Sequence, residues 1–214
     1  MPSMLSETRM RELLRPFAVA LDAQQAAQAQ TYLELLLRWN QKINLTSIRD
    51  PEQVITRHFG EALFLHTRER LTGNLLDIGS GAGFPGLALK IVLPGIPATL
   101  LEPIAKKRAF LKEVIRSCGF DAVEVRPERL EEAARQGAKF SVATARAIGP
   151  AEQLAGQCIA ILSEGGKLYL WTTQGQSENL GEASGLINWT QRLAIPLSRE
   201  REILIGVRQP TAAH

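Results

Sequence analysis

The stretch from Asn74 to Val92, NLLDIGSGAGFPGLALKIV, decides the fold class. Its first residues form an apolar run that predicts a buried strand, and Gly79-Ser80-Gly81-Ala82-Gly83 then predicts a tight loop. After the loop, Pro85 opens an apolar segment with helical character. Glycines suit such a loop because the backbone turns through dihedral angles closed to other residues and a ligand can approach the main chain directly. This order of elements predicts a βα unit that binds a nucleotide-like ligand.

The glycine loop is compatible with two kinds of cofactor. Gly81, Gly83 and Gly86 fit the spacing G-x-G-x-x-G, which keeps a nicotinamide or flavin dinucleotide open. Asp77, two residues before the first glycine, extends the pattern to D-x-G-x-G-x-G. A carboxylate at the mouth of the loop would repel a pyrophosphate and attract a cation. S-adenosylmethionine carries an ammonium and a sulfonium and no phosphate, and the pattern resembles the first motif of the class I methyltransferases.

A second carboxylate follows the next predicted strand. Ala98-Thr99-Leu100-Leu101 predicts the next strand, and Glu102 follows it about 20 residues beyond the loop, where an acid would accept hydrogen bonds from both ribose hydroxyls. The alternative is an ordinary βαβ turn followed by a surface acid. The cofactor contacts that these residues predict are Asp77, Gly79, Ser80, Gly81, Gly83 and Glu102.

Composition bounds the class of protein. A chain of 214 residues holds one large domain or one domain with an extension. The net charge of +3 permits an RNA partner without predicting one. Cys118 and Cys158 lack the spacing of a zinc site or a disulfide framework, so we expect no metal, a reduced cytoplasmic setting, and two small core residues in helices. No apolar run reaches the roughly 20 residues of a membrane span, so we expect no membrane partner. We also expect a monomer.

The pattern changes near residue 70. Residues 1–70 are predicted to form an N-terminal helical cap, with Ser6 and Asp22 capping two helices and a third helix running from Pro51 to about His66. From residue 71 to 214, strands alternate with helices, as expected of a cofactor-binding methyltransferase domain. The two segments are therefore predicted as separate domains.

The later strands define the predicted topology. Residues 122–125, 140–145 and 166–171 give the third, fourth and fifth strands, and helices are predicted over about 104–118, around Leu130 and from Pro150. The runs 188–195 and 202–207 are joined by a loop too short for a helix, so they must pair antiparallel. The prediction is an α/β, Rossmann-like doubly wound sheet of the class I methyltransferase type, closed by a C-terminal hairpin. A nicotinamide-binding domain would more often continue with another βα unit.

Ligands of such sheets lie beyond the carboxyl ends of the strands, which selects further residues. Leu130 and Glu131 follow the third strand and are candidates to hold an adenine ring, the alternative being a capped surface helix. Arg146 ends the fourth strand and is a candidate for substrate positioning, the alternative being a salt bridge to a neighbouring carboxylate. The first turns of the helix after Glu102 carry three cations, Lys106, Lys107 and Arg108. Each has an unfavourable interaction with the helix dipole of about 0.3–1 kcal/mol, a cost that indicates contacts with phosphates. The alternative is a solvated helix face.

Missing motifs narrow the reaction. The chain has no Pro-Pro pair of the kind used to methylate exocyclic base amines, and neither cysteine has the context of a pyrimidine-C5 nucleophile. The kind of methyl acceptor that remains is an atom with its own lone pair, such as purine N7. Such an atom needs no general base. We therefore name no catalytic acid or base, and catalysis would rest on alignment and exclusion of water.

From about Leu33 to Val207 the chain resembles the bacterial RsmG-like (GidB) small-subunit ribosomal RNA methyltransferases. The cofactor loop is matched by residues 77–86, including the specific Gly83-Phe84-Pro85-Gly86. The other matching segments are Arg38-Trp39-Asn40, Asn44 to Pro51 with its Asn-Leu-Thr element, Arg57-His58-Phe59, Lys107-Arg108 with Phe110-Leu111, and Ala145-Arg146-Ala147.

This resemblance implies transfer of a methyl group from S-adenosylmethionine to N7 of a guanine in 16S ribosomal RNA. By position it implies cofactor contacts at Gly79, Phe84, Leu130, Glu131 and Arg146, with Glu102 on the ribose, and an RNA-facing rim of Asn44, Thr46, Arg57 and His58.

The chain departs from the family pattern at two places. Where relatives have Leu-Asp-Ser, this chain has Gly60-Glu61-Ala62, and where they have Lys-Gly after the fifth strand, it has Trp171-Thr172-Thr173. The second departure keeps open a non-catalytic assembly factor that binds S-adenosylmethionine or RNA, beside the nicotinamide oxidoreductase.

Overall fold

The computed structural model describes residues 5–146, 151–177 and 186–210. Within them lies a seven-stranded sheet in the order β3-β2-β1-β4-β5-β7-β6. Its strands are β1 (Leu75–Ile78), β2 (Ala98–Leu101), β3 (Val123–Arg126), β4 (Phe140–Arg146), β5 (Leu162–Thr173), β6 (Ile187–Ala194) and β7 (Arg201–Arg208). The first five pair in parallel, and β7 is antiparallel to both β5 and β6. The predicted doubly wound sheet with a terminal hairpin is confirmed.

Most strand boundaries differ from the prediction by one or two residues, and the start of β5 differs by four. β3 begins at Val123 because Ala122 takes a left-handed conformation (φ 53°) that interrupts the extended chain. β5 begins at Leu162, earlier than the predicted 166, and an irregularity between Phe140 and Val142 in its partner accommodates the extra length.

The helices that cover the sheet are α5 (Gly86–Leu89), α6 (Ala105–Cys118), α7 (Leu130–Arg135), α8 (Ala151–Cys158) and α9 (Gln174–Ser177). Successive residues along a strand enter different cores, as the period of two requires: Leu75 packs in one hydrophobic cluster and Leu76 in the other. Cys118 and Cys158 end α6 and α8 and are buried free thiols, as predicted. Pro150, the predicted start of α8, lies outside the described residues.

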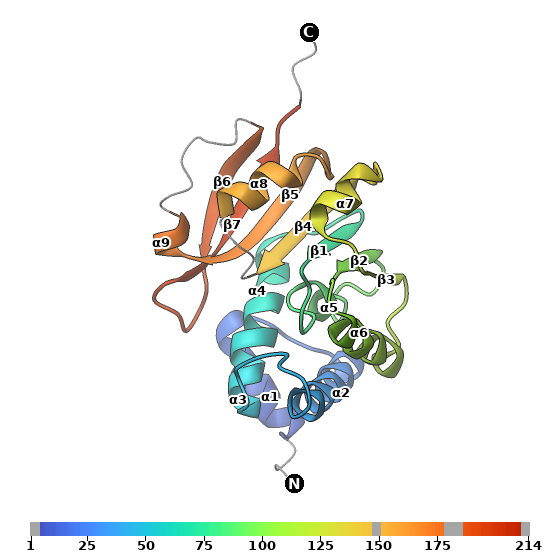
Figure 1. Cartoon of the computed structure of the whole chain (residues 1–214). Helices are drawn as coiled ribbons and strands as arrows, with labels where there is room; N and C mark the ends of the chain where they lie inside the picture. The colour runs from blue at the N-terminus through green and yellow to red at the C-terminus, as the bar shows by residue number, and fades with distance from the viewer. Residues whose placement is uncertain (1–4, 147–150, 178–185, 211–214) are drawn as a thin grey trace.

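The N-terminal segment is helical, as predicted. It comprises α1 (Glu7–Leu14), a 3-10 turn η1 (Arg15–Phe17), α2 (Ala23–Asn40), α3 (Pro51–Val54), a π-helical turn η2 (Ile55–Gly60) and α4 (Glu61–Arg68). Ser6 caps α1, and Asp22 forms a capping box with Gln25 at the start of α2. Figure 1 shows these helices gathered at the end of the sheet toward which the β4 arrow points.

The helical segment and the first face of the sheet share one hydrophobic core. Tyr32 and Leu36 of α2 are buried in the same cluster as Leu100 of β2 and Ile203 of β7. The change of secondary structure near residue 70 is therefore not a change of core.

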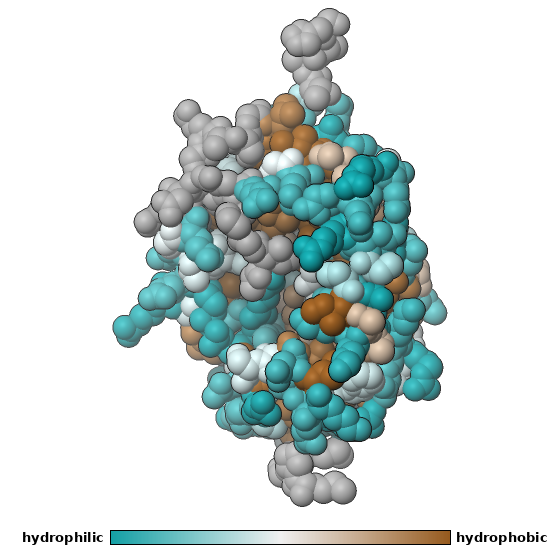
Figure 2. Space-filling view, in the orientation of Figure 1, coloured by the Kyte–Doolittle hydropathy of each residue, from teal (hydrophilic) through white to brown (hydrophobic). Residues whose placement is uncertain are grey.

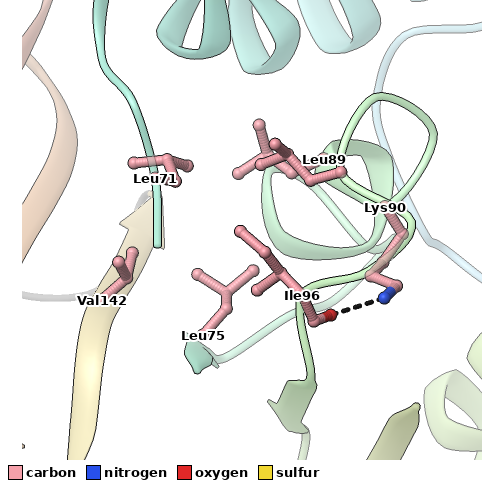
Figure 3. A pocket seen from close by; sticks show the side chains of 7 residues that line it. Leu71, Leu75, Leu89, Lys90, Ile96 and Val142 are labelled. Atoms are coloured by element: carbon pink, nitrogen blue, oxygen red, sulfur yellow. Dashed lines mark hydrogen bonds between the residues drawn. The ribbon is translucent and has the colours of Figure 1, made fainter. Parts of the chain in front are cut away.

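A small apolar cavity lies beside the first residue of β1, at the end of the strand opposite the glycine loop. Leu71, Leu89 and Val142 line it, and Figure 3 shows these side chains pointing toward one another. Lys90 is buried here, and its Nζ donates hydrogen bonds to the carbonyls of Pro94 (2.7 Å) and Ile96 (2.5 Å), while burial lowers the pKa of this amine. The cavity is a packing feature at the wrong end of the sheet for the predicted ligand.

Candidate cofactor and acceptor site

The carboxyl ends of three parallel strands place the site. Ile78 of β1 pairs with Leu101 of β2 on one side and with Ala145 of β4 on the other. The residues that follow, Gly79, Glu102 and Arg146, therefore lie at the same edge of the sheet, as predicted. The sequence motifs meet in space because parallel strands in register end together.

The glycine loop is built as its residue types require. Gly79, Gly81 and Gly83 have φ of 63°, 54° and 87°, in the region that L side chains avoid. A Cβ on Gly83 would lie 2.0 Å from the hydroxyl oxygen of Tyr32, so close packing also excludes a side chain there. Gly79 is exposed, whereas Ser80 is buried and donates from its hydroxyl to the carbonyl of Asp77 (3.2 Å). The loop thus presents bare backbone at Gly79 and Gly81.

Glu102 closes the loop from the neighbouring strand. Its carboxylate accepts one hydrogen bond from the Gly81 amide and one from the Ile104 amide, both at 2.8 Å. Each oxygen keeps a lone pair for a further donor such as a ribose hydroxyl. Beside it, Ile104 is 50% exposed and offers an apolar surface. Arg108, predicted to face RNA, instead donates to the carbonyls of Glu102 (3.0 Å) and Pro103 (2.6 Å) and so holds this turn.

Asp77 does not lie where the sequence suggested. Its side chain has no exposed surface, and Oδ1 accepts a hydrogen bond from the Thr144 hydroxyl at 2.7 Å. Oδ2 has no hydrogen-bond partner among the described residues. Burial raises the pKa of Asp77 to about 6, against the lowering effect of the hydrogen bond from Thr144. The prediction that Asp77 sits at the mouth of the loop is therefore wrong: it packs behind the loop and links β1 to β4.

An aromatic stack ties the helical segment to the loop. Phe84 is stacked between Tyr32 (centroids 5.2 Å apart) and His58 (4.9 Å), and the Tyr32 hydroxyl donates to the carbonyl of Ala82 at 2.6 Å. Phe84, predicted as a cofactor contact, is only 7% exposed and mainly supports the loop. Burial, together with the charges of Arg146 and Arg57, lowers the pKa of His58 to about 3, so its ring is neutral at pH 7.

The predicted RNA-facing rim is organised by Asn40. The Asn40 amide accepts from the backbone of Leu45 and Thr46 and donates to the carbonyl of Thr46, which fixes the loop after α2. Thr46 then contacts His58 (Oγ1 to Nε2 2.8 Å), and Asn44 is exposed. Asn40 belongs to a matched motif, but its role in shaping the rim was not predicted.

Arg146 forms the salt bridge that was the alternative to a substrate role. Its Nη2 lies 3.3 Å from Oε2 of Glu61 and donates to the carbonyl of Arg57 at 2.9 Å. Burial lowers the pKa of Arg146, and its Nη1 has no hydrogen-bond partner among the described residues. Sequence reasoning missed Glu61 as its partner, although the family departure at Gly60-Glu61-Ala62 pointed to this position. Ala147, in the same motif, lies outside the described residues.

The remaining candidates lie on other surfaces. Leu130 is buried in the second core, whereas Glu131 is exposed and accepts a hydrogen bond from Gln157 (2.9 Å). Lys106 is exposed and Lys107 half-buried, and neither forms an ion pair with a residue that the structure describes. Figure 2 shows a mostly hydrophilic face with several separate hydrophobic areas.

The described residues lack two features, a cluster of metal ligands and a membrane-spanning helix. They contain no group of three or more His, Cys, Asp or Glu side chains placed to hold a metal ion. None of their helices combines the length and apolar character that crossing a membrane requires.

Fold and site together define a class I methyltransferase. The fold is shared with solved structures such as a variant of MtNAS in complex with S-adenosylmethionine, at a TM-score of 0.60 and 16% identity over 98% of this chain and 86% of that one. A ribosomal protein L11 methylase from Lactobacillus delbrueckii subsp. bulgaricus gives a TM-score of 0.58 and 15% identity over 72% and 80%. At these identities the likeness shows the fold alone.

The chain belongs to the family described as GidB, rRNA small subunit methyltransferase G, whose sequence model matches residues 25–201. It is 40% identical to ribosomal RNA small subunit methyltransferase G of Chloroflexus aggregans over 76% of this chain and 70% of that protein. With the protein of the same name from Halorhodospira halophila it shares 36% identity over 85% and 84%. The predicted family, and the class of S-adenosylmethionine-dependent methyltransferases, are confirmed over the nicotinamide alternative.

The residues present fit S-adenosylmethionine. A Cβ built on Gly81 meets only the Gly79 carbonyl, at 3.7 Å, so the space above the loop is open to a ligand. Glu102, which is 3% exposed, is hydrogen-bonded to the Gly81 amide of this loop, and the half-exposed Ile104 side chain follows it two residues later. Together they offer bare backbone, acceptors for hydroxyls and an apolar surface, which suit an adenosyl group.

Replacing Gly86 by alanine tests how tightly Asp77 packs behind the loop. In a helix, alanine is favoured over glycine by about 1 kcal/mol. Here the new Cβ would lie 2.3 Å from Cβ of Asp77, and such overpacking costs about 1–3 kcal/mol, so the clash should prevail. We expect Gly86→Ala to lower the free energy of unfolding in urea and to weaken S-adenosylmethionine binding in calorimetry.

The matched control for this variant is Gly156→Ala in α8, where the added Cβ meets nothing within 4 Å. It should leave cofactor binding unchanged and retain or increase stability. A Gly86→Ala protein as stable as the wild type would contradict the described packing.

Buried Asp77 predicts a particular pH dependence of stability. Its pKa rises from 3.8 to about 6 on folding, so its favourable contribution is complete below the lower value and is lost as pH rises through the higher one. The change amounts to roughly 3 kcal/mol at most. We expect the unfolding free energy of the wild type minus that of Asp77→Asn, from urea denaturation, to fall from about pH 4 to 7.

Thr144→Val sharpens this test. It removes a hydrogen bond that lowers the pKa of folded Asp77, so the fall should begin at the same pH, extend to higher pH and become larger. If the difference in unfolding free energy between the wild type and Asp77→Asn does not change between about pH 4 and 7, Asp77 does not have a raised pKa in the folded protein.

Proposed function

We propose that this protein transfers a methyl group from S-adenosylmethionine to N7 of a guanine in small-subunit ribosomal RNA. One observation carries the proposal: in a chain of this family, a glycine loop locked by the Glu102 carboxylate and exposed at Gly79 lies at the same sheet edge as Arg146, which ends β4 and is ion-paired to Glu61. The loop would bind the cofactor, and the arginine side chains would bind a polyanionic substrate.

The acid–base chemistry of the site agrees with a ring nitrogen as acceptor. Asp77 has no exposed surface, and His58, with a pKa near 3, is too weak a base to remove a proton at neutral pH. Guanine N7 needs no such base because its lone pair is free. The N7–methyl bond forms as the sulfur–methyl bond breaks, the bonding electrons return to sulfur, and the positive charge moves to the guanine ring.

On this proposal the chain's residues bind, orient and exclude water. The bound cofactor supplies a methyl group on a positively charged sulfur. Glu102 would accept from the ribose hydroxyls, and the backbone at Gly79 and Gly81 would lie against the cofactor. Arg146 is the candidate contact for the carboxylate of S-adenosylmethionine, through its Nη1, which is buried and has no hydrogen-bond partner among the described residues. The backbone at Leu130 and the Glu131 side chain border the adenine.

The acceptor side is formed by the rim that the helical segment supplies. Its members are Asn44, Thr46, Arg57 and His58, with Lys106 and Lys107 on the start of α6. We further propose a monomer that works in the cytoplasm on ribosomal RNA or on the small subunit.

Methyl transfer in vitro tests the proposal directly. Purified protein, labelled S-adenosylmethionine and small subunits from cells lacking the gene should yield 7-methylguanosine in nucleoside mass spectrometry. Glu102→Ala removes charged hydrogen-bond acceptors worth about 1.5–3 kcal/mol each, so its dissociation constant for the cofactor should rise at least about tenfold. A methyl group on another atom, or no incorporation into subunits or free RNA, would defeat the assignment.

A further inference from the structure

A single buried carboxylate joins three arginines from distant parts of the chain. Glu61, at the start of α4, is 1% exposed. Its Oε1 accepts from Nε of Arg57 (3.1 Å) and Nε of Arg201 (2.9 Å), and its Oε2 lies 3.3 Å from Nη2 of Arg146. We call these four residues the Glu61 junction. Three guanidinium cations around one carboxylate leave two positive charges uncompensated.

Two of these arginines are anchored at one end and free at the other. Arg57 and Arg201 each use Nε on the same oxygen of Glu61, and their terminal amino groups form no hydrogen bond with any residue that the structure describes. Their side chains are 43% and 26% exposed. The free ends are therefore held close together and open to solvent, the arrangement with which arginine forks bind phosphate.

The junction stands beside the cofactor loop. Arg146 follows Ala145, which pairs with Ile78, the residue before Gly79. Arg201 pairs with Thr173 at the end of β5. The junction thus lies at the edge of the sheet where β1, β4 and β5 end and β7 begins, the edge that also carries the glycine loop.

The backbone around the junction is fixed. The indole of Trp171 donates to the carbonyl of Glu61 at 2.9 Å, and Arg146 donates to the carbonyl of Arg57 at the same distance. The neighbouring His58 lies in the positive potential of these arginines. Burial lowers the pKa of His58, and the charges of Arg146 and Arg57 lower it further. One ion pair would be enough to hold the helical segment against the sheet. The two further arginines leave the junction with a net positive charge, which favours the binding of an external anion.

We propose that Arg57 and Arg201 together bind a backbone phosphate of the RNA substrate, and that Glu61 is the positioning residue that holds the two guanidinium groups side by side. This inference rests on the proposed function and names the part of the site that receives the nucleic acid. The Glu61 carboxylate reaches both arginines through one oxygen, Oε1.

The test uses the double variant Arg57→Gln/Arg201→Gln in the full-length protein. The KM for small subunits should rise at least about tenfold while kcat at saturating RNA and the calorimetric affinity for S-adenosylmethionine stay unchanged. The slope of log affinity for 16S ribosomal RNA against log salt should become less negative by about 0.7, the loss of one phosphate contact. Arg201→Lys keeps the charge without the fork and should recover only part of the affinity.

Arg135→Gln is the matched control, because it removes an exposed arginine on α7 and should leave KM and salt slope unchanged. Glu61→Gln should raise KM and lower the melting temperature together, since it leaves the three cations without a counter-charge. A double variant that melts lower but keeps the wild-type KM and salt slope would reduce the junction to a structural clamp and overturn the inference. Weakened binding of S-adenosylmethionine with unchanged RNA affinity would assign the anion to the cofactor and also overturn it. Either result leaves the proposed function standing when the wild type forms 7-methylguanosine, whereas no product from the wild type defeats that function itself.

Discussion

The hydrogen bond from the Gly81 amide to the Glu102 carboxylate is the constraint on which the site depends. It joins the end of β2 to the loop after β1, and so sets the distance between bare backbone and a carboxylate at the mouth of the sheet. The same carboxylate receives the Ile104 amide, and Arg108 holds the carbonyls of this turn. Acid, loop and the start of α6 therefore form one rigid unit, and such preorganisation reduces the entropy lost when a ligand binds.

The N-terminal helices form a wall of this site and share its core. Tyr32 of α2 supports the loop through the Ala82 carbonyl, and Phe84 stacks between Tyr32 and His58. Because Gly83 lies against the Tyr32 hydroxyl, helix and loop must move together. A change deep in α2 is therefore transmitted to the backbone that faces the cofactor.

Charge is divided across the site in a way that matches a transfer from a cationic donor to a polyanionic acceptor. Glu102 and the buried Asp77 lie on the loop side. Arg57, Arg146 and Arg201 gather around Glu61 on the other side. On the proposed function, the arginines would attract the anionic substrate to this edge of the sheet.

The sequence by itself determined the sheet, the hairpin, the helix caps and the positions of the glycine loop and Glu102, because these depend on local periodicity, on glycine and on strands that end together. Tertiary structure decided which way the polar side chains point. Asp77 turned inward because Thr144, from another strand, offers a donor behind the loop, and Arg108 turned to the carbonyls at its own helix start. The Glu61 junction was beyond sequence reasoning because Glu61 and Arg201 stand 140 residues apart, and only the packing of α4 against the hairpin brings them together.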